Sequence, residues 1–355
     1  MKTKLSEIST VTMGQSPKSS AYNFDRNGLP LLQGKTTFGR MYPYFEVWTS
    51  EWNKEADKDD LLFTVRAPVG DINIASESIA IGRGIAAIKA IKCSYKYLYY
   101  LLIANKEKFV LSSTGTIYDS INKNDLESVE LNIHGACEQQ HIVDTIGSID
   151  DLIEKNNKVV QLIEVILEGI FTNLYNRIED NKLYKLGETF VCLLGGTPNT
   201  KNQNYWDGDI NWINSGEVNN FRVLNPSRNI TIEGLNNSAT KLLPKKTTVI
   251  AITGATLGQV SLLEINACAN QSVIGILENS NFGYEFIFPL IKYIIPKIIL
   301  NQTGGAQQHI NKNDVESTLI KLPLKQEYSK YLEKVIPLYE YQSLLIKTNH
   351  RLSFL

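Results

Sequence analysis

Two stretches of the 355-residue sequence are nearly the same: "TGTIYDSINKNDLES" at residues 114–128 and "TGGAQQHINKNDVES" at residues 303–317. Working outward from them, "GQSP" at residues 14–17 is matched by "GGTP" at residues 195–198. The offset of about 181 to 189 residues is far longer than the ~20–50 residues of a solenoid repeat. The chain is therefore a tandem duplication of a whole domain, with loops of different length in a common framework.

A long heptad pattern follows the first copy. Alternating steps of four and three meet nine aliphatic residues and one asparagine: Ile142, Ile146, Ile149, Ile153, Asn156, Val160, Ile163, Leu167, Ile170 and Leu174. A two-in-seven apolar stripe over five heptads is typical of a coiled coil, and one polar seam residue such as Asn156 typically fixes the register. An ordinary amphipathic helix packed on a core is the alternative.

A weaker heptad pattern follows the second copy. The same phase gives Tyr331, Val335, Leu338, Gln342, Leu345, Asn349 and Leu352. We expect Pro337 to kink this second helix or to mark its start. The obvious partner for one seam is the other, so we expect an antiparallel pair of helices, with the two domains related by a pseudo-twofold axis.

The sequence predicts four segments of two kinds. Mixed α/β (α+β) domains are expected at residues 1–137 and 179–325, because strand-like runs lie between Gly-rich turns in both. Long spacer helices are expected at residues 138–178 and 326–355.

The composition is that of a globular protein, with 43% hydrophobic and 21% charged residues and a formal net charge of −1. Neither a signal peptide nor an apolar run of the ~20 residues that span a membrane is recognisable. The four cysteines Cys93, Cys137, Cys192 and Cys268 are far apart in sequence, which favours buried, reduced thiols in a cytoplasmic protein. The four histidines form no ligand pattern with them, so no metal site is expected.

The order of domain, long helix, domain and long helix resembles the specificity subunit of type I restriction–modification systems. The motifs that carry the resemblance are a "K-L-[SG]-[ED]" stretch, a "G-x-[ST]-P" turn, a "T-G-x-x-x-x-x-[IL]-x-x-x-D" closing segment and an "E-Q-x-x-I" helix start. They lie at Lys4–Glu7, Gly14–Pro17, Thr114–Asp125 and Glu138–Ile142 in the first copy, and at Lys185–Glu188, Gly195–Pro198 and Thr303–Asp314 in the second.

This resemblance implies that each α/β domain is a target-recognition domain that reads one half of a bipartite site in double-stranded DNA. The paired helices would set the gap between the half-sites and dock methyltransferase subunits, two being expected. Restriction and motor subunits would join that complex. Such a subunit is not an enzyme and holds no cofactor. From the residues themselves, no amino-methyltransferase motif and no Ser/His/Asp order stands out.

The matched loops hold the residue types that read bases in the major groove, where Arg or Lys suits guanine and Asn or Gln suits adenine. The two copies share the framework of these loops but carry different polar side chains at the loop ends. Two domains that read different half-sites would need this difference. The candidates for DNA contact are Lys35, Thr36, Arg66, Arg83, Tyr118, Asn214, Ser215, Thr253, Gln271, Gln307 and Gln308. The shared Lys123 and Lys312 are candidates for phosphate contact, and an ion pair at a helix start or plain solvation is the alternative. The residues around them, Asn122, Asp125, Asn311 and Asp314, are typical of turns and helix N-caps.

Two other functions stay open. A nucleotide-binding enzyme would use "GKT" at residues 34–36 and "GRG" at residues 82–84. The first misses the spacing of a phosphate-binding loop by one residue, and neither loop is kept in the second copy. A coiled-coil scaffold that binds protein alone would need no recognition loops.

Overall fold

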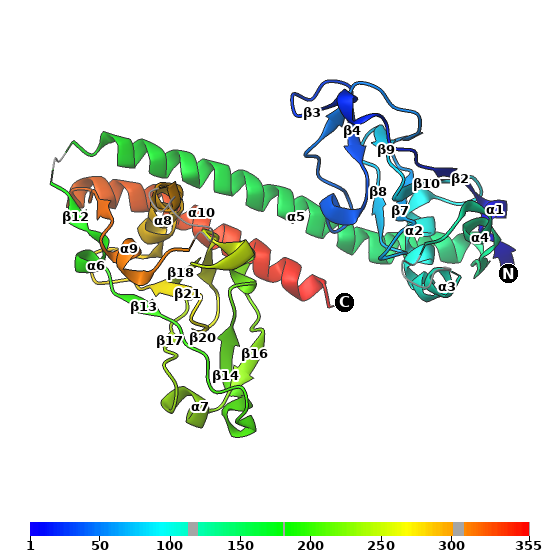
Figure 1. Ribbon diagram of the computed structural model, residues 1–355. Coiled ribbons are helices and arrows are strands. Elements are labelled where there is room, and N and C mark those ends of the chain that lie inside the picture. The colour runs from blue at the N-terminus through cyan, green and yellow to red at the C-terminus, as the bar shows by residue number, and fades with distance from the viewer. Residues whose placement is uncertain (113–119, 180–181, 301–308, 355) are drawn as a thin grey trace. The chain divides into compact units, whose positions relative to one another are not determined.

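In a computed structural model, the chain forms two compact units, Met1–Leu152 and Ile153–Leu355 (Figure 1). The structure describes residues 1–112, 120–179, 182–300 and 309–354. The division between the units falls inside the longest helix, α5 (Ala136–Arg177).

The described residues of unit 1 form two main sheets and four short helices. An antiparallel sheet has the strand order β2 (Ser9–Met13), β10 (Ile85–Ala90), β7 (Leu61–Thr64) and β8 (Ile72–Ile74). The second sheet has the order β3 (Tyr22–Asn23), β5 (Trp48–Thr49), β4 (Leu29–Leu32), β9 (Ile79–Ile81) and β6 (Glu55–Ala56). β1 (Lys2–Lys4) pairs with β11 (Glu130–Asn132). The helices are α1 (Leu5–Ile8), α2 (Tyr95–Ala104), α3 (Lys106–Leu111) and α4 (Lys123–Ser128), with 3-10 turns η1 (Ser19–Ala21) and η2 (Lys35–Thr37).

The strand β7 explains how unit 1 is layered, because all four of its residues are buried. Leu61 and Phe63 belong to the core that α2 covers, whereas Leu62 belongs to the core shared with β4 and β9. Successive side chains of a strand point to opposite faces, so β7 supports a helix layer on one side and the second sheet on the other.

Unit 2 repeats this arrangement. Its first sheet has the order β13 (Cys192–Leu194), β21 (Val273–Ile276), β18 (Thr248–Ala251), β19 (Val260–Leu263) and β15 (Arg222–Val223). Its second sheet has the order β16 (Arg228–Ile230), β14 (Trp206–Ile213), β20 (Ala267–Ala269) and β17 (Leu242–Leu243), and β12 (Tyr184–Lys185) pairs with β22 (Leu319–Ile320). The helices are α6 (Leu186–Thr189), α7 (Ile232–Asn236), α8 (Tyr284–Leu300), α9 (Lys312–Glu316) and α10 (Lys325–Leu352), with 3-10 turns η3 (Gln203–Tyr205), η4 (Glu217–Asn219) and η5 (Gly254–Thr256).

The identical "INKND" segments start α4 and α9 in the same way. The side chains of Asn122 and Asn311 accept hydrogen bonds from the N–H groups of Asp125 and Asp314, each at 3.0 Å. These bonds satisfy one of the orphan donors at each helix start, as the sequence predicted.

Within unit 2, the latter part of α5 and the whole of α10 pack side by side and antiparallel (Figure 1). The Nδ2 of Asn156 donates to Oδ1 of Asn349 at 2.8 Å, and Nε2 of Gln342 donates to the carbonyl of Val160 at 3.3 Å. Residue numbers rise along one helix as they fall along the other, so the prediction of an antiparallel pair is confirmed.

The predicted seam is buried for most of its length in unit 2. Buried members are Ile153, Asn156, Ile163, Leu167 and Leu345, while Val160, Leu338 and Ile170 are partly buried against the same core. Leu352 is half-buried at the end of α10. In unit 1, Ile142 packs against that unit's own core, Ile149 is half-buried and Ile146 is 46% exposed. The coiled-coil role of Ile146 and Ile149 stays a prediction.

Pro337 does not mark the start of the second helix, because α10 begins at Lys325 and runs through it. A proline inside a helix removes the hydrogen bond to the carbonyl four residues earlier. Both Pro337 and Glu333 are exposed. The carbonyl of Glu333, which loses its hydrogen bond, therefore lies on the side of the helix that water reaches.

The cysteines differ from the expectation of four buried thiols. Cys192 and Cys268 are buried, Cys93 is half-buried and Cys137 is exposed, and none of the four is in a disulfide. Within the described ranges, no helix has both the length and the apolar character needed to cross a bilayer.

Candidate functional site

A polar groove of about 440 Å³ lies in unit 1, where four loops that are far apart in sequence meet. It contains four of the candidates for DNA contact, Lys35, Thr36, Arg66 and Arg83. Its other lining residues include Ser16, Gln33, Gly34, Thr64 and Gly84. We refer to this feature as the unit 1 groove.

Backbone hydrogen bonds fix the position of Arg66. The N–H of Val65 donates to the carbonyl of Gly84 at 3.0 Å, and the N–H of Ile121 donates to the carbonyl of Val65 at 3.0 Å. Arg66 thus follows Val65, whose N–H and carbonyl groups are both hydrogen-bonded to other loops. Its side chain is exposed at the end of this rigid frame.

Arg83 is held by the turn of the "GQSP" motif. Its N–H donates to Oγ of Ser16 at 3.2 Å. A Cβ on the following Gly84 would lie 2.2 Å from the carbonyl oxygen of Gln33, so only glycine allows the two loops to approach this closely. The glycine in "GRG" therefore serves the packing of the Arg83 loop against the Gln33 loop.

The charges in the unit 1 groove are unequally compensated. Nζ of Lys35 lies 2.9 Å from Oδ2 of Asp71, whose Oδ1 lies 2.5 Å from Nζ of Lys106. Burial alone would raise the pKa of Asp71, but its bonds to the two lysines outweigh burial and lower the pKa below the ordinary value. Asp71 therefore stays a carboxylate, and Lys35 shares it with Lys106.

The guanidinium groups of Arg66 and Arg83 differ from Lys35 in this respect. Among the described residues, neither guanidinium has an ion pair or a hydrogen bond with another side chain. Both side chains are exposed on the groove. The uncompensated positive charge of the groove is thus concentrated on two planar, donor-only groups.

Unit 2 has the same backbone frame with other side chains. The N–H of Ile252 donates to the carbonyl of Ser272 at 2.9 Å, and the N–H of Ile310 donates to the carbonyl of Ile252 at 3.0 Å. These bonds match those of Val65, so Thr253 occupies the position equivalent to Arg66. Likewise Gln271 occupies the position of Arg83, and its Oε1 accepts a hydrogen bond from the hydroxyl of Thr197 in the "GGTP" turn.

The structure also brings in a residue that sequence reasoning missed. Leu32 pairs with Ile81 in parallel, and Ile213 pairs with Ala269 in the same way. The next residues, Gln33 and Asn214, are therefore equivalent, and both carry amides. Lys35 and Thr36 are not the direct counterparts of Asn214 and Ser215, because the loop before the following 3-10 turn is one residue longer in unit 2.

The remaining candidates have local roles or lie outside the described residues. Lys123 is 3.6 Å from Glu127 and Lys312 is 3.2 Å from Glu316, each pair one helical turn apart. These are the helix-start ion pairs that the sequence offered as an alternative to phosphate contact. Tyr118, Gln307 and Gln308 fall outside the residues that the structure describes.

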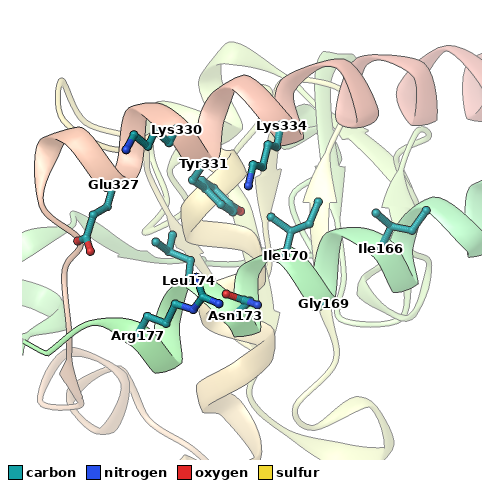
Figure 2. Close-up of a pocket in the computed structure, with 10 residues that line it drawn as sticks. All are labelled: Ile166, Gly169, Ile170, Asn173, Leu174, Arg177, Glu327, Lys330, Tyr331 and Lys334. Atoms are coloured by element: carbon teal, nitrogen blue, oxygen red, sulfur yellow. The ribbon is translucent and has the colours of Figure 1, made fainter.

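A second groove, of about 630 Å³, lies between α5 and α10 in unit 2 (Figure 2). Figure 2 shows Tyr331 of α10 pointing toward Ile170 and Leu174 of α5, with Ile166 farther along α5. The side chains of Arg177, Lys330 and Lys334 bring positive charge to it. On the same stretch of α5, Leu162, Val165 and Ile166 are exposed by 64%, 67% and 50%. We refer to these three residues together with the groove as the helix-pair surface.

A family model described as the type I restriction modification DNA specificity domain matches residues 1–165 and 178–349. The chain belongs to this family. The two matched ranges agree with the duplication and with the repeated backbone frame. Type I specificity subunits are non-catalytic, so the family argues against a nucleotide-binding enzyme. The "GKT" and "GRG" loops on which that alternative depended both line the unit 1 groove.

Individual type I specificity subunits are similar to this chain. A Methanocaldococcus jannaschii protein, provisionally named the MjaX specificity subunit of a type I restriction enzyme, is 42% identical over 156 residues. That match covers 43% of this chain and spans only 37% of the relative's own length. The MjaIX specificity subunit of the same organism is 22% identical over 95% of this chain and 86% of its own length. The crystal structure of the S subunit of a type I restriction–modification system from M. genitalium has the same fold, with a TM-score of 0.65, 15% identity and coverage of 100% of this chain and 93% of that one.

Proposed function

We propose that this specificity subunit recognises double-stranded DNA, and that each α/β domain reads one half of a bipartite site. The observation that carries the proposal is the repeated frame. Val65 and Ile252 make the same two backbone hydrogen bonds, yet the residues that follow them are Arg66 and Thr253. One framework with two sets of polar tips suits one task performed on two different targets.

The proposed domains are residues 1–137 and 179–325, with spacer helices at residues 138–178 and 326–355. The bounds of α5 and α10 support this division. In the proposal, the helix pair sets the spacing between the half-sites. The buried bond between Asn156 and Asn349 favours one register of that pair, because a shift would leave two amides unsatisfied.

The helix-pair surface would dock the methyltransferase subunits, two per complex, and the restriction subunits would join through them. Leu162 and Val165 are exposed on a helix whose other face is already buried. Exposed apolar side chains grouped on one face are typical of protein–protein interfaces. A coiled-coil scaffold without DNA binding would use the same surface, so DNA recognition needs its own test.

DNA recognition is tested by selection from random duplex pools with the complex of this chain and its methyltransferase. We expect enrichment of two short sequences at a fixed spacing. If the complex enriches no bipartite sequence, the recognition function is wrong and the scaffold function is favoured.

Docking is tested by Leu162→Ser, with Ile232→Ser as the matched control, because both residues are 64% exposed. Burying an aliphatic side chain contributes roughly 1.5–3 kcal/mol, so Leu162→Ser is expected to weaken methyltransferase binding roughly 10- to 100-fold. Ile232 lies on α7, away from the helix pair, and its substitution is expected to change nothing. Equal affinity of the two variants would contradict docking on this surface.

A further inference from the structure

The two units differ sharply in hydrogen-bonding chemistry at one pair of equivalent positions. Unit 1 presents the guanidiniums of Arg66 and Arg83, whereas unit 2 presents the hydroxyl of Thr253 and the amide of Gln271. The matched backbone bonds make this a difference of side chains on one frame. It therefore carries information about what each unit binds.

The chemistry of a guanidinium limits which base edge it can satisfy. An arginine side chain has five N–H donors and no acceptor. Guanine presents two acceptors in the major groove, O6 and N7, which match two parallel donors. Adenine presents one acceptor and one donor there, so its N6 amino group would face a second donor of the arginine.

The geometry of the unit 1 groove favours reading by Arg66 and Arg83 over reading by Lys35. Lys35 is held by Asp71 at 2.9 Å, so its ammonium group already has a carboxylate partner. Among the residues that the structure describes, the two guanidiniums have no acceptor to satisfy them. Their backbones are fixed by Gly84 and Ser16, as precise base recognition requires.

We infer that the half-site read by unit 1 contains guanine, contacted by Arg66 or Arg83 or both, and that this preference is absent at the equivalent positions of unit 2. The inference rests on the proposed function. It goes further by assigning base chemistry to one of the two half-sites and by naming the side chains that determine it.

The test compares selected sites of the reconstituted methyltransferase complex carrying the wild-type chain, Arg66→Gln or Arg83→Gln. We expect at least one variant to lose preference for guanine at one position, by about 5- to 150-fold, since a good bidentate pair has this discriminating power. The other half-site should stay as it is. Gln271→Ala is expected to change that other half-site instead, which identifies the half-site that belongs to each unit.

Arg66→Lys and Arg83→Lys separate base reading from phosphate contact. Lysine keeps the charge but lacks the planar fork, so guanine reading should still weaken, whereas a phosphate contact would be retained. Lys89→Gln removes an exposed charge of unit 1 that lies outside the groove, and it serves as the control. A uniform loss of affinity on all sequences, with a smaller salt dependence, would assign the arginines to phosphates and overturn the inference.

The outcomes also separate this inference from the proposed function. If the wild-type complex selects a bipartite site and neither arginine variant relaxes a guanine position, the inference fails and the function stands. If the wild-type complex selects no bipartite site, both fail.

Discussion

Replacing Gln342 by leucine is expected to destabilise unit 2 strongly, although glutamine is an unusual residue for a helix seam. Gln342 is fully buried, and its Oε1 accepts a hydrogen bond from Nη2 of Arg222 at 2.7 Å. Its Nε2 donates to Oε2 of Glu164 at 3.2 Å. It therefore links α10 both to α5 and to β15 in the first sheet of unit 2.

The loss of unfolding free energy depends on Arg222, which leucine at position 342 would leave without its hydrogen-bond acceptor. Arg222 is 5% exposed, and its Nε and Nη1 atoms have no hydrogen-bond partner in the part of the chain that the structure describes. Burial lowers the pKa of Arg222, as expected for a cation held away from water. Leaving a buried donor without its acceptor costs about 1–3 kcal/mol, and more when the donor is charged. We expect about 3 kcal/mol, because the rings of Phe221 and Phe288 still face the guanidinium.

Thermal unfolding measures the effect, with hydrogen exchange of α10 as the local readout. For a unit of this size, about 3 kcal/mol corresponds to a fall in Tm of roughly 6–12 °C. Gln161→Leu is the matched control, because Gln161 is exposed on α5. The double variant Arg222→Met/Gln342→Leu removes the charge together with its acceptor and is expected to recover most of the loss. A double variant no more stable than Gln342→Leu would refute this reasoning.

Three further perturbations have defined outcomes. Gly14→Ala places a Cβ 2.2 Å from a backbone carbonyl and is expected to cost about 1–3 kcal/mol in urea unfolding, whereas Gly34→Ala, with open space around it, should cost nearly nothing. Burial alone raises the pKa of Glu264, but two lysine ammonium groups outweigh it and hold the pKa below 4.5. The stability this gives is present above pH 4.5 and lost as the pH falls through the folded pKa, so urea midpoints should fall in acid, and less so for Glu264→Gln. Asn311→Ala removes an N-cap and should lower stability by about 1 kcal/mol, and an equal effect of Asn313→Ala would contradict the capping argument.

The duplication and the long helices were predictable because each leaves a pattern in the sequence. The heptad positions from Ile142 to Leu174 all lie within α5. The "INKND" segments indicated two N-caps, and both are present. These features depend on neighbours in sequence, where hydrogen bonds and apolar periodicity are local.

Contacts between distant residues were not predictable. Nothing in the sequence indicates that Asp71 pairs with Lys35, because 36 residues separate them. Gln342 and Asn349 make the second heptad pattern look weak, yet both are buried and bonded across the helix pair. The equivalence of Gln33 and Asn214 needed the strand register, since the loops after them differ in length by one residue.

The frame around Val65 and Ile252 has a consequence for how such a protein diverges. Its hydrogen bonds run through backbone atoms, and so they are indifferent to which side chain stands at the next position. Exposed substitutions of this kind usually change stability by less than about 0.5 kcal/mol. If positions 66 and 253 read DNA as proposed, changes of specificity there would meet little opposition from folding. Gly14 and Gly195 differ in this respect, because an added Cβ would lie 2.2 Å and 2.1 Å from a backbone carbonyl oxygen, so the fold itself opposes their replacement.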